Sequence, residues 1–387
     1  MTDMLDQLPE VDVWGSHGVA TEAVTVEMMK DRGKLLTVAD VMAQLAVTEP
    51  LTQIGFESAT FKVAPDWNTS ADVTLLNGED MVDASMNIGG TEYPLTYDAL
   101  LEATSAVGIT QAYTNKAPAF LTDSALNYWF DKKQPHELKL LSMNGTARAL
   151  TRATITPFSN VRFLEEAVSA IEAKYPGVEV LVDSKFSHSL RKTYLRLVVP
   201  EIAKDIESAR HHGHSPDTWS GGVSFTNSLI GLGQTEISAY LLAWLCTNGA
   251  IATQGDTKWN RRRGGQGDEV YDWMRITVDD MLGQFDHEFE KVEALVGIGL
   301  EGHEEEVSRT LTDIFTEYKV PVAARERIIL NMTNSDDLSM YGVMQAITMA
   351  ANMLDSPDGQ VETLMRVGGD LAMAEHSRCN QCHRLSV

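Results

Sequence analysis

Residues 193–199 read TYLRLVV and are followed by Pro200, near the middle of a chain of 387 residues. Aromatic and β-branched side chains are favoured in strands, so this stretch predicts a strand that the proline closes. The sequence VEVLVD at 178–183 has the same character, and GVSFTN at 222–227 predicts a third strand. A long polar connection that contains HHGHSPDTWSGG leads into that third strand.

A helix is expected after these strands, from Thr235 to Cys246. Thr235 suits a helix N-terminus, Glu236 adds an acid to the first turn, and Asn248-Gly249 would end the helix. The order strand-strand-strand-helix predicts an antiparallel sheet with a helix packed behind it. The outer face of that sheet would then be free to bind another molecule.

The regions on either side differ in character. Residues 1–140 combine helical patterns at 37–45, 98–107 and 122–130 with strand-like stretches at 54–57 and 61–63. Residues 271–387 are helical in pattern, with further helices expected at 304–318, 322–331 and 338–353. One apolar stripe at three- and four-residue spacing comprises Leu282, Phe285, Phe289, Val292 and Val296. We therefore predict an α+β fold in three regions: residues 1–140, a strand-strand-strand-helix core at 141–270, and an all-helical C-terminal region at 271–387.

Composition argues against several protein classes. With 43% hydrophobic residues the chain can bury a large core, and no apolar run approaches the roughly 18 residues that a membrane-spanning helix needs. The N-terminus, MTDMLDQLPEVDVW, is acidic and lacks the basic and apolar regions of a secretory signal. Three cysteines do not make a disulfide framework in a chain of this length. We expect a soluble cytoplasmic protein.

The charge is unevenly distributed. The chain carries 55 acidic residues against 31 lysines and arginines, a net charge of -24, which counts against a general binder of nucleic acid or anionic membranes. Between Lys185 and Arg275 there are 11 basic and 9 acidic residues, so the middle is nearly neutral while both flanks are strongly acidic. Because salt screens charges beyond about 10 Å, a local basic groove is compatible with an acidic protein.

The segment GVSFTNSLIG at 222–231 is followed by LCTNG at 245–249, and RALTRATITPFSN lies upstream at 148–160. Together they resemble a phage- and plasmid-borne family catalogued as domain of unknown function 932, with its NSE-x-G and CTNG pattern and an Arg-containing turn that leads to a D-N pair. Leu229 departs from the pattern, because the family usually has an acidic residue there. The likeness covers roughly residues 140–255 and implies a phage or prophage origin, without a settled activity.

A second likeness lies in the order of the elements alone. Strand-strand-strand-helix is also the core order of single-strand annealing proteins of recombination, which form rings and bind DNA in a basic groove. This is an analogy between folds, and it implies nothing about individual residues.

Basic and planar side chains in the middle region would suit single-stranded DNA. Such a site needs cations along the phosphate track and planar groups on which bases stack, each stack being worth roughly 1–3 kcal/mol. The stretch TKWNRRRGG at 257–265 supplies both, and the predicted first hairpin supplies a second group, in which Tyr194 and Arg196 share a face of one strand. The candidate residues are Lys185, Arg191, Lys192, Tyr194, Arg196, Lys258, Trp259, Arg261, Arg262, Arg263 and Arg275.

The arginine run also has a plainer interpretation. It would be a solvated loop in which Arg261 to Arg263 pair with Asp256, Asp268 and Glu269, or a surface that faces another protein.

The C-terminal sequence HSRCNQCH at 376–383 has the residue spacing of some zinc sites. Its candidate ligands are Cys379, Cys382, His383 and His376. Zinc normally requires a second ligand pair; the histidines at 211, 212 and 214 could donate, whereas Cys246 is most simply a buried residue. The CxxCH run also matches covalent haem attachment, which the lack of an export signal disfavours. A frayed terminus is the alternative, and we expect no cofactor.

No motif anchors an enzymatic activity. The phosphate-binding GxxxxGK[ST], HExxH, GxSxG and dinucleotide fingerprints are absent from the sequence. Adjacent acids such as Asp279-Asp280 point to different faces of a helix and usually mark a solvated surface. A catalytic Cys246 with a distant histidine is the remaining enzymatic alternative.

These observations predict a phage-encoded protein that binds or anneals single-stranded DNA in recombination or replication, in the host cytoplasm. Its expected partners are single-stranded DNA, further copies of the chain and a phage or host recombination or replication protein, with no membrane. The alternative is a phage structural or self-assembling protein, including an acidic decoy of a host DNA-binding protein. Salt dependence separates the two, because affinity for phosphates falls steeply with salt.

Overall fold

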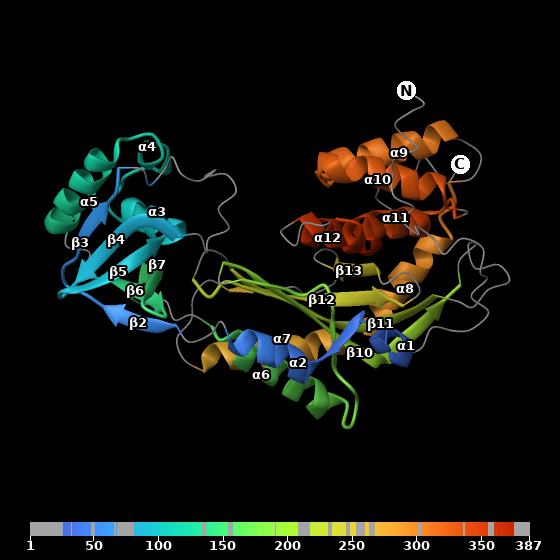
Figure 1. Cartoon of the computed structure of the whole chain (residues 1–387). Helices are drawn as coiled ribbons and strands as arrows, with labels where there is room; N and C mark the ends of the chain where they lie inside the picture. Colours follow the sequence, from blue (N-terminus) through green and yellow to red (C-terminus); the bar gives the residue numbers. More distant parts are fainter. Residues whose placement is uncertain are drawn as a thin grey trace.

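The computed structural model describes residues 26–31, 33–47, 51–65, 67, 81–133, 137–153, 158–189, 191–207, 217–230, 234–244, 248–252, 260–262, 268–300, 304–335, 337–354 and 360–374. The molecule has a large and a small lobe, each built on one mainly antiparallel sheet (Figure 1). The helices α7 to α12 follow all the strands in the chain. The predicted α+β class with a helical C-terminal region is confirmed.

The large lobe is built on a sheet of eight strands in the order β1-β8-β10-β11-β12-β13, with β9 pairing with β10 and β14 with β12. The bounds of its strands are β1 (Leu35–Thr37), β8 (Leu181–Asp183), β9 (Ser187–His188), β10 (Thr193–Ile206), β11 (Asp217–Asn227), β12 (Thr235–Ala243), β13 (Asn248–Ala252) and β14 (Asn260–Arg262). The three strands predicted from sequence are therefore present, but β10 continues through Pro200 to Ile206, so the predicted end at that proline is wrong. They are joined by others that the sequence did not indicate.

The predicted helix from Thr235 to Cys246 is wrong. Residues Thr235–Ala243 form β12, a central strand that pairs with β11 on one edge and with β13 and β14 on the other. Nearly every residue of β12 is buried because both faces of the sheet are covered, so its sequence lacks the alternation of a half-exposed strand. β11 likewise begins at Asp217, inside the stretch predicted as a polar connection, and fully buries Trp219.

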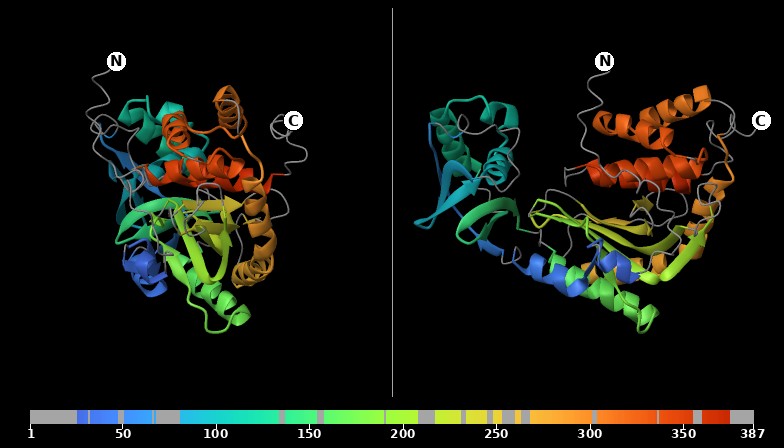
Figure 2. Two further views of the ribbon diagram at one scale, coloured as in Figure 1. Left: turned by 90° about the vertical axis from the view of Figure 1, so that its right-hand side faces the viewer. Right: turned by 45° about the vertical axis from the view of Figure 1, so that its right-hand side comes forward.

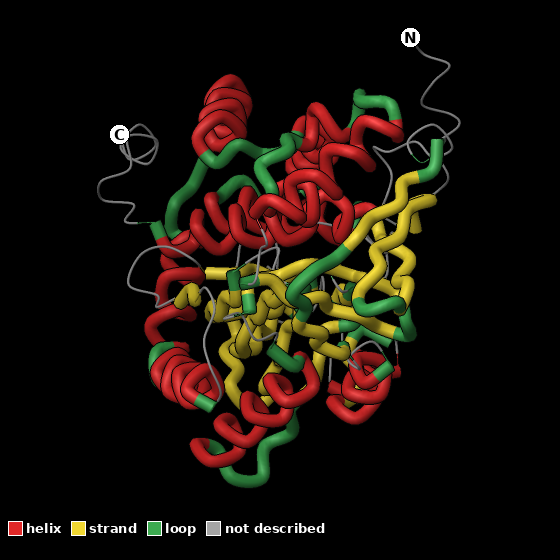
Figure 3. Tube along the Cα trace, turned by 90° about the vertical axis from the view of Figure 1, so that its left-hand side faces the viewer, coloured by secondary structure: helices red, strands yellow, loops and turns green. Residues whose placement is uncertain are grey.

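Helices cover both faces of the large sheet, so the expectation of a free outer face is also wrong. Figure 1 shows α2 (Val38–Ala46), α6 (Asn160–Lys174) and α7 (Glu269–Leu282) below the sheet, and α11 (Met340–Asn352) and α12 (Gln360–Met373) above it. Figure 3 shows the same layers from the side, with strands between helices. On the lower face the ring of Phe163 stacks on that of Phe225 with 3.4 Å between centroids.

The helical C-terminal region continues with α8, α9 and α10. The predicted apolar stripe from Leu282 to Val296 is divided between the end of α7 and α8 (Phe285–Val296). α9 (Glu304–Glu317) and α10 (Val322–Thr333) pack beyond α11, at the outer edge of the large lobe (Figure 2). No helix in the described part of the chain is long and apolar enough to cross a membrane.

The small lobe contains the second sheet, of order β2-β6-β7-β5-β4-β3, whose strands are β2 (Thr52–Gly55), β3 (Thr60–Val63), β4 (Met81–Ile88), β5 (Thr91–Thr96), β6 (Leu138–Met143) and β7 (Thr146–Arg152). It carries α3 (Tyr97–Ala106), α4 (Gln111–Thr114) and α5 (Ala119–Lys133), so helices predicted at 98–107 and 122–130 are confirmed. The helix predicted at 37–45 is α2, which together with α1 (Val26–Asp31) packs on the large sheet instead.

The lobes meet at one end of the large sheet. Leu229 and Ile230, directly after β11, are buried against Leu141 and Ala149 of the small sheet. Leu229 stands where the resembled family usually has an acidic residue, and here it is only 2% exposed. An apolar side chain at this position therefore serves the contact between the two lobes.

Candidate nucleic-acid interface

The register of the large sheet brings two of the sequence-predicted basic groups to the same end. Tyr194 of β10 lies in one transverse row with Thr226, Glu236 and Arg261, and the next row contains Thr193 and Arg262. Neighbouring strands lie about 4.8 Å apart, so β10 and β14 are about 14 Å apart across this end. Residues some distance apart in the chain thus converge beside the lobe junction.

The hairpin that precedes β10 contributes Arg191 and Lys192. Arg191 reaches across the junction, where its Nη2 lies 2.9 Å from Oδ1 of Asp98 in α3. The ammonium of Lys192 lies 4.5 Å from the centre of the Tyr194 ring, a cation–π contact. Arg191 remains 46% exposed, so it is both an anchor between the lobes and an accessible cation.

Two predicted contacts with nucleic acid are corrected by burial. Tyr194 and Arg196 share a face as expected, but α12 covers that face and leaves them 4% and 2% exposed. Arg196 pairs with Glu362 of α12 at 3.0 Å and donates to the backbone carbonyl of Lys185 at 2.8 Å. A side chain held in this way cannot reach a phosphate track in solvent.

A buried network extends from this ion pair. Arg366 bridges two acids, at 3.1 Å from Glu362 and 2.7 Å from Glu236. The ammonium of Lys185 is buried without a hydrogen-bond partner among the described residues, and burial lowers its pKa to about 8. Lys185 is partly exposed as a residue, but its ammonium group is withdrawn from solvent, and its prediction as a phosphate contact is corrected.

The stretches that carry the family resemblance meet at this end of the sheet. Asn227 donates to the side-chain oxygen of Asn160 at 2.8 Å and to the carbonyl of Phe158 at 2.9 Å, and it accepts from Thr235 at 3.1 Å. Asn160 in turn donates to Thr193. These buried side chains tie the ends of three strands to the start of α6, which gives the two asparagines a structural role.

The glycine of the CTNG stretch has a structural role too. Gly249 of β13 faces Tyr240, and a side chain at this glycine would collide with the phenol. The hydroxyl of Tyr240 donates to Asp183 at 2.5 Å, and burial raises the pKa of Tyr240 well above its usual value. The glycine thus makes room for a buried hydrogen bond between β12 and β8.

Arg275 lies apart from the interface. It is on α7, beneath the sheet, where it pairs with Asp272 and lies 3.6 Å from Glu166. Asp268, which the loop interpretation had assigned to the arginine run, pairs with Arg162 at 2.5 Å. The row of basic residues at the sheet end therefore does not include Arg275.

Several predicted residues lie outside the described part of the chain: Lys258, Trp259, Arg263, Cys379, Cys382, His383, His376 and the histidines at 211, 212 and 214. Arg261 and Arg262 are placed as backbone in β14. Within the described ranges no three His, Cys, Asp or Glu side chains come together as a metal site would require.

An exposed aromatic surface on α4 and α5 was not predicted from the sequence. All four exposed aromatic side chains of the described residues lie on α4 and α5: Tyr113, Phe120, Tyr128 and Trp129. The sequence pattern indicated a helix here, and its buried face is Leu126 with Phe130. The sequence does contain a signal for the opposite, exposed face. Phe120 and Leu121 recur eight residues later as Tyr128 and Trp129, a spacing that brings apolar side chains to the same side of a helix.

Comparison of the chain with protein-family models, with curated proteins and with solved structures finds no match, and the resemblance to domain of unknown function 932 stays a prediction.

Proposed function

We propose that the protein binds single-stranded DNA at the end of the large sheet beside the lobe junction, and acts in phage recombination or replication. The observation that carries the proposal is the register, which aligns Arg261 and Arg262 of β14 with the hairpin that bears Arg191 and Lys192. The backbone positions of basic residues that are separate in the sequence thereby fall in one short row, which we call the basic row. A phosphate backbone is the ligand that such a row suits.

The location also supports the proposal. Among the described strands β14 pairs with β12 alone, and it is flanked in the sequence by Trp259 and Arg263. A planar side chain beside cations is what sequence-tolerant binding of single strands requires. Because Arg196 and the ammonium of Lys185 are buried, the proposed site comprises only the hairpin with Arg191 and Lys192 and the strand β14. A short oligonucleotide would therefore span it.

Fluorescence anisotropy of a labelled single-stranded oligonucleotide tests the site with a matched pair of variants. Arg261→Ala/Arg262→Ala should bind roughly tenfold more weakly than the parent at low salt, because two phosphate contacts are lost. Lys62→Ala/Arg309→Ala removes two exposed positive charges elsewhere and should bind like the parent. An equal loss of affinity in both variants would mean that only the net charge of the protein matters, and it would refute the proposed site.

A self-assembling phage protein is the second candidate function. It is favoured by a separate observation, the exposed apolar side chains of α5 and α10, which a monomer in water has no reason to display together. Assembly and DNA binding involve different surfaces of the molecule.

A further inference from the structure

Exposed apolar side chains gather at two places on the described surface. Of twelve large hydrophobic side chains that are exposed there, five lie between Tyr113 and Trp129 and four lie between Val322 and Leu338. Scattered single residues of this kind are normal, but contiguous groups mark interaction sites. The two groups, at α4–α5 and at α9–α10, lie at opposite ends of the molecule (Figures 1 and 2).

The first group lies on α4 and α5, and we call it the aromatic face: Tyr113, Phe120, Leu121, Tyr128 and Trp129. Phe120 is 66% exposed, Tyr128 56% and Trp129 42%. Taking ~200 Å² for each aromatic side chain, these three expose on the order of 300 Å². This is enough to form the centre of an interface of about 800 Å² per partner, with polar residues around it.

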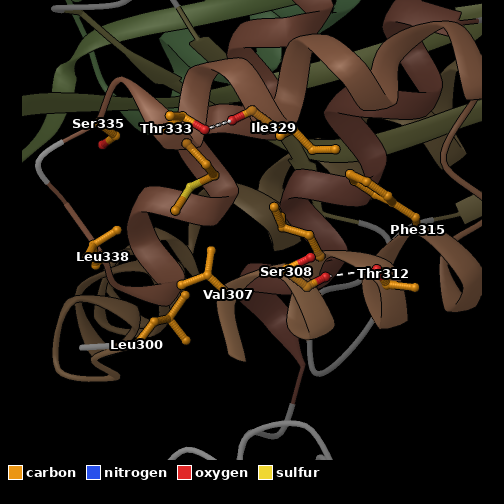
Figure 4. A pocket seen from close by; sticks show the side chains of 11 residues that line it. Leu300, Val307, Ser308, Thr312, Phe315, Ile329, Thr333, Ser335 and Leu338 are labelled. Atoms are coloured by element: carbon orange, nitrogen blue, oxygen red, sulfur yellow. Dashed lines mark hydrogen bonds between the residues drawn. The ribbon is translucent and has the colours of Figure 1, made fainter. Parts of the chain in front are cut away.

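The second group lines a groove between α9 and α10 with a volume of about 640 Å³. Figure 4 shows Val307 and Phe315 of α9 and Ile329 of α10 bordering the same space, which Leu300 and Leu338 close at one end. Ile329 is 48% exposed and Leu338 39%, so the groove is open to solvent. A groove of this kind between two helices receives an amphipathic helix in many complexes.

The charges beside the two surfaces are of opposite sign. α9 carries five acidic residues and one arginine, whereas α5 ends in Lys132 and Lys133. These lysines accompany the rings, because their ammonium groups lie 5.9 Å and 5.6 Å from the ring centres of Tyr128 and Trp129. Aromatic side chains that enter the groove would thus bring cations to the acidic helix at its border.

We infer that the aromatic face of one copy docks into the α9–α10 groove of a second copy. The two surfaces lie too far apart in one chain to meet each other, so the contact joins two molecules. Each copy has one aromatic face and one groove, so the interface is head-to-tail. A third copy can therefore add at either end of a dimer.

The test uses one variant for each surface. Phe120→Glu/Tyr128→Glu places acids on the aromatic face, and Ile329→Glu/Leu338→Glu places them in the groove; all four side chains are exposed, so circular dichroism should show a parent-like fold. Sedimentation velocity of the parent should show mass that grows with concentration beyond a dimer. Each variant alone should sediment as one chain of 42.6 kDa.

The equimolar mixture of the two variants is decisive. One variant retains its groove and the other its aromatic face, so together they form a single intact interface and should stop at a 1:1 dimer. A mixture that stays monomeric, or a parent that is monomeric into the micromolar range, overturns the inference. So would an aromatic-face variant that assembles like the parent but loses oligonucleotide binding, because the aromatic face would then be a platform for nucleic acid.

Discussion

The role predicted for Arg196 from the sequence differs from its role in the structure. A cation beside an aromatic residue on a strand suggested a phosphate contact, and the alternation that put Arg196 and Tyr194 on one face was right. What covers that face is α12, 166 residues further along the chain at Glu362. No local pattern around 193–199 reports on a partner so distant, so the burial could not be predicted.

The buried pair gives a direct prediction for stability. Arg196→Met should lower the free energy of unfolding by about 3–5 kcal/mol, because it leaves Glu362 buried with a single remaining cation. Arg196→Met/Glu362→Gln should recover part of that loss, since neither buried charge remains. Urea unfolding of the two variants measures both values, and a single variant that costs under ~1 kcal/mol would contradict the described network.

Glu102 of α3 predicts a dependence on pH. Burial raises the pKa of Glu102 to about 8 from 4.5 and the charge of Asp98 adds to the rise, although a 2.6 Å hydrogen bond from the backbone of Leu150 and the charge of Arg191 both lower this pKa. The folded state therefore holds this proton at pH values where the unfolded chain has lost it. The stability from the neutral acid is complete below pH 4.5 and is lost as the pH rises towards 8.

Glu102→Gln should remove this dependence. The variant keeps an acceptor for Leu150 and cannot ionise, so its stability relative to the parent should grow by up to ~1.4 kcal/mol per pH unit through that interval, about 5 kcal/mol in all, and then level off. Thermal unfolding at a series of pH values provides the measurement. A constant difference between variant and parent across the series would show that Glu102 does not titrate in this way.

At the scale of elements, most of the correct predictions fall on half-exposed helices. α9 and α10 were predictable because each has exposed residues alternating with buried ones at helical spacing, whereas α11 was predicted although it is almost entirely buried. α2 begins at the expected Thr37, which accepts a hydrogen bond from Asp40. β12 failed for the opposite reason: both of its faces are buried, and TEISAYLLA reads equally as a short buried helix. Three neighbouring strands decide its state, and they are not local to it.

The contact between α11 and α12 predicts a coupled pair of substitutions. A Cβ at Gly368 would collide with the methyl group of Thr348. Gly368→Ala should therefore lower stability by about 1–3 kcal/mol, as overpacking does. Thr348→Ser removes that methyl and keeps the hydroxyl that donates to Met344, so it should restore most of the loss in the double variant. Additive effects in a double-mutant cycle would rule out the close approach of the two helices.

At the scale of the whole molecule, the junction between lobes organises the proposed site. Leu229 fills it with Ile230 against the small sheet, and Arg191 ties the hairpin to Asp98. Which lobe each segment joins was not readable from the sequence, because it depends on pairing between strands that are far apart in the chain. The proposed basic row depends on the register of these strands.

Leu229→Glu tests the junction. It introduces the acid that the resembled family usually has and leaves a carboxylate buried without a partner, so the lobes should separate more easily. Limited proteolysis should cut the variant faster between the lobes than the parent. Leu229→Met, which preserves volume and polarity, should be cut at the parent rate. Equal cutting of the glutamate variant would mean that this cluster does not hold the lobes together.

The most direct measurement of the central claim is the salt dependence of oligonucleotide affinity for the parent and for Arg261→Ala/Arg262→Ala. The logarithm of the binding constant should fall linearly with the logarithm of salt concentration, and the slope should be shallower by about 2 in the variant, one for each lost phosphate contact. Absence of binding at low salt, or identical slopes for both proteins, would contradict a DNA site at the end of the large sheet.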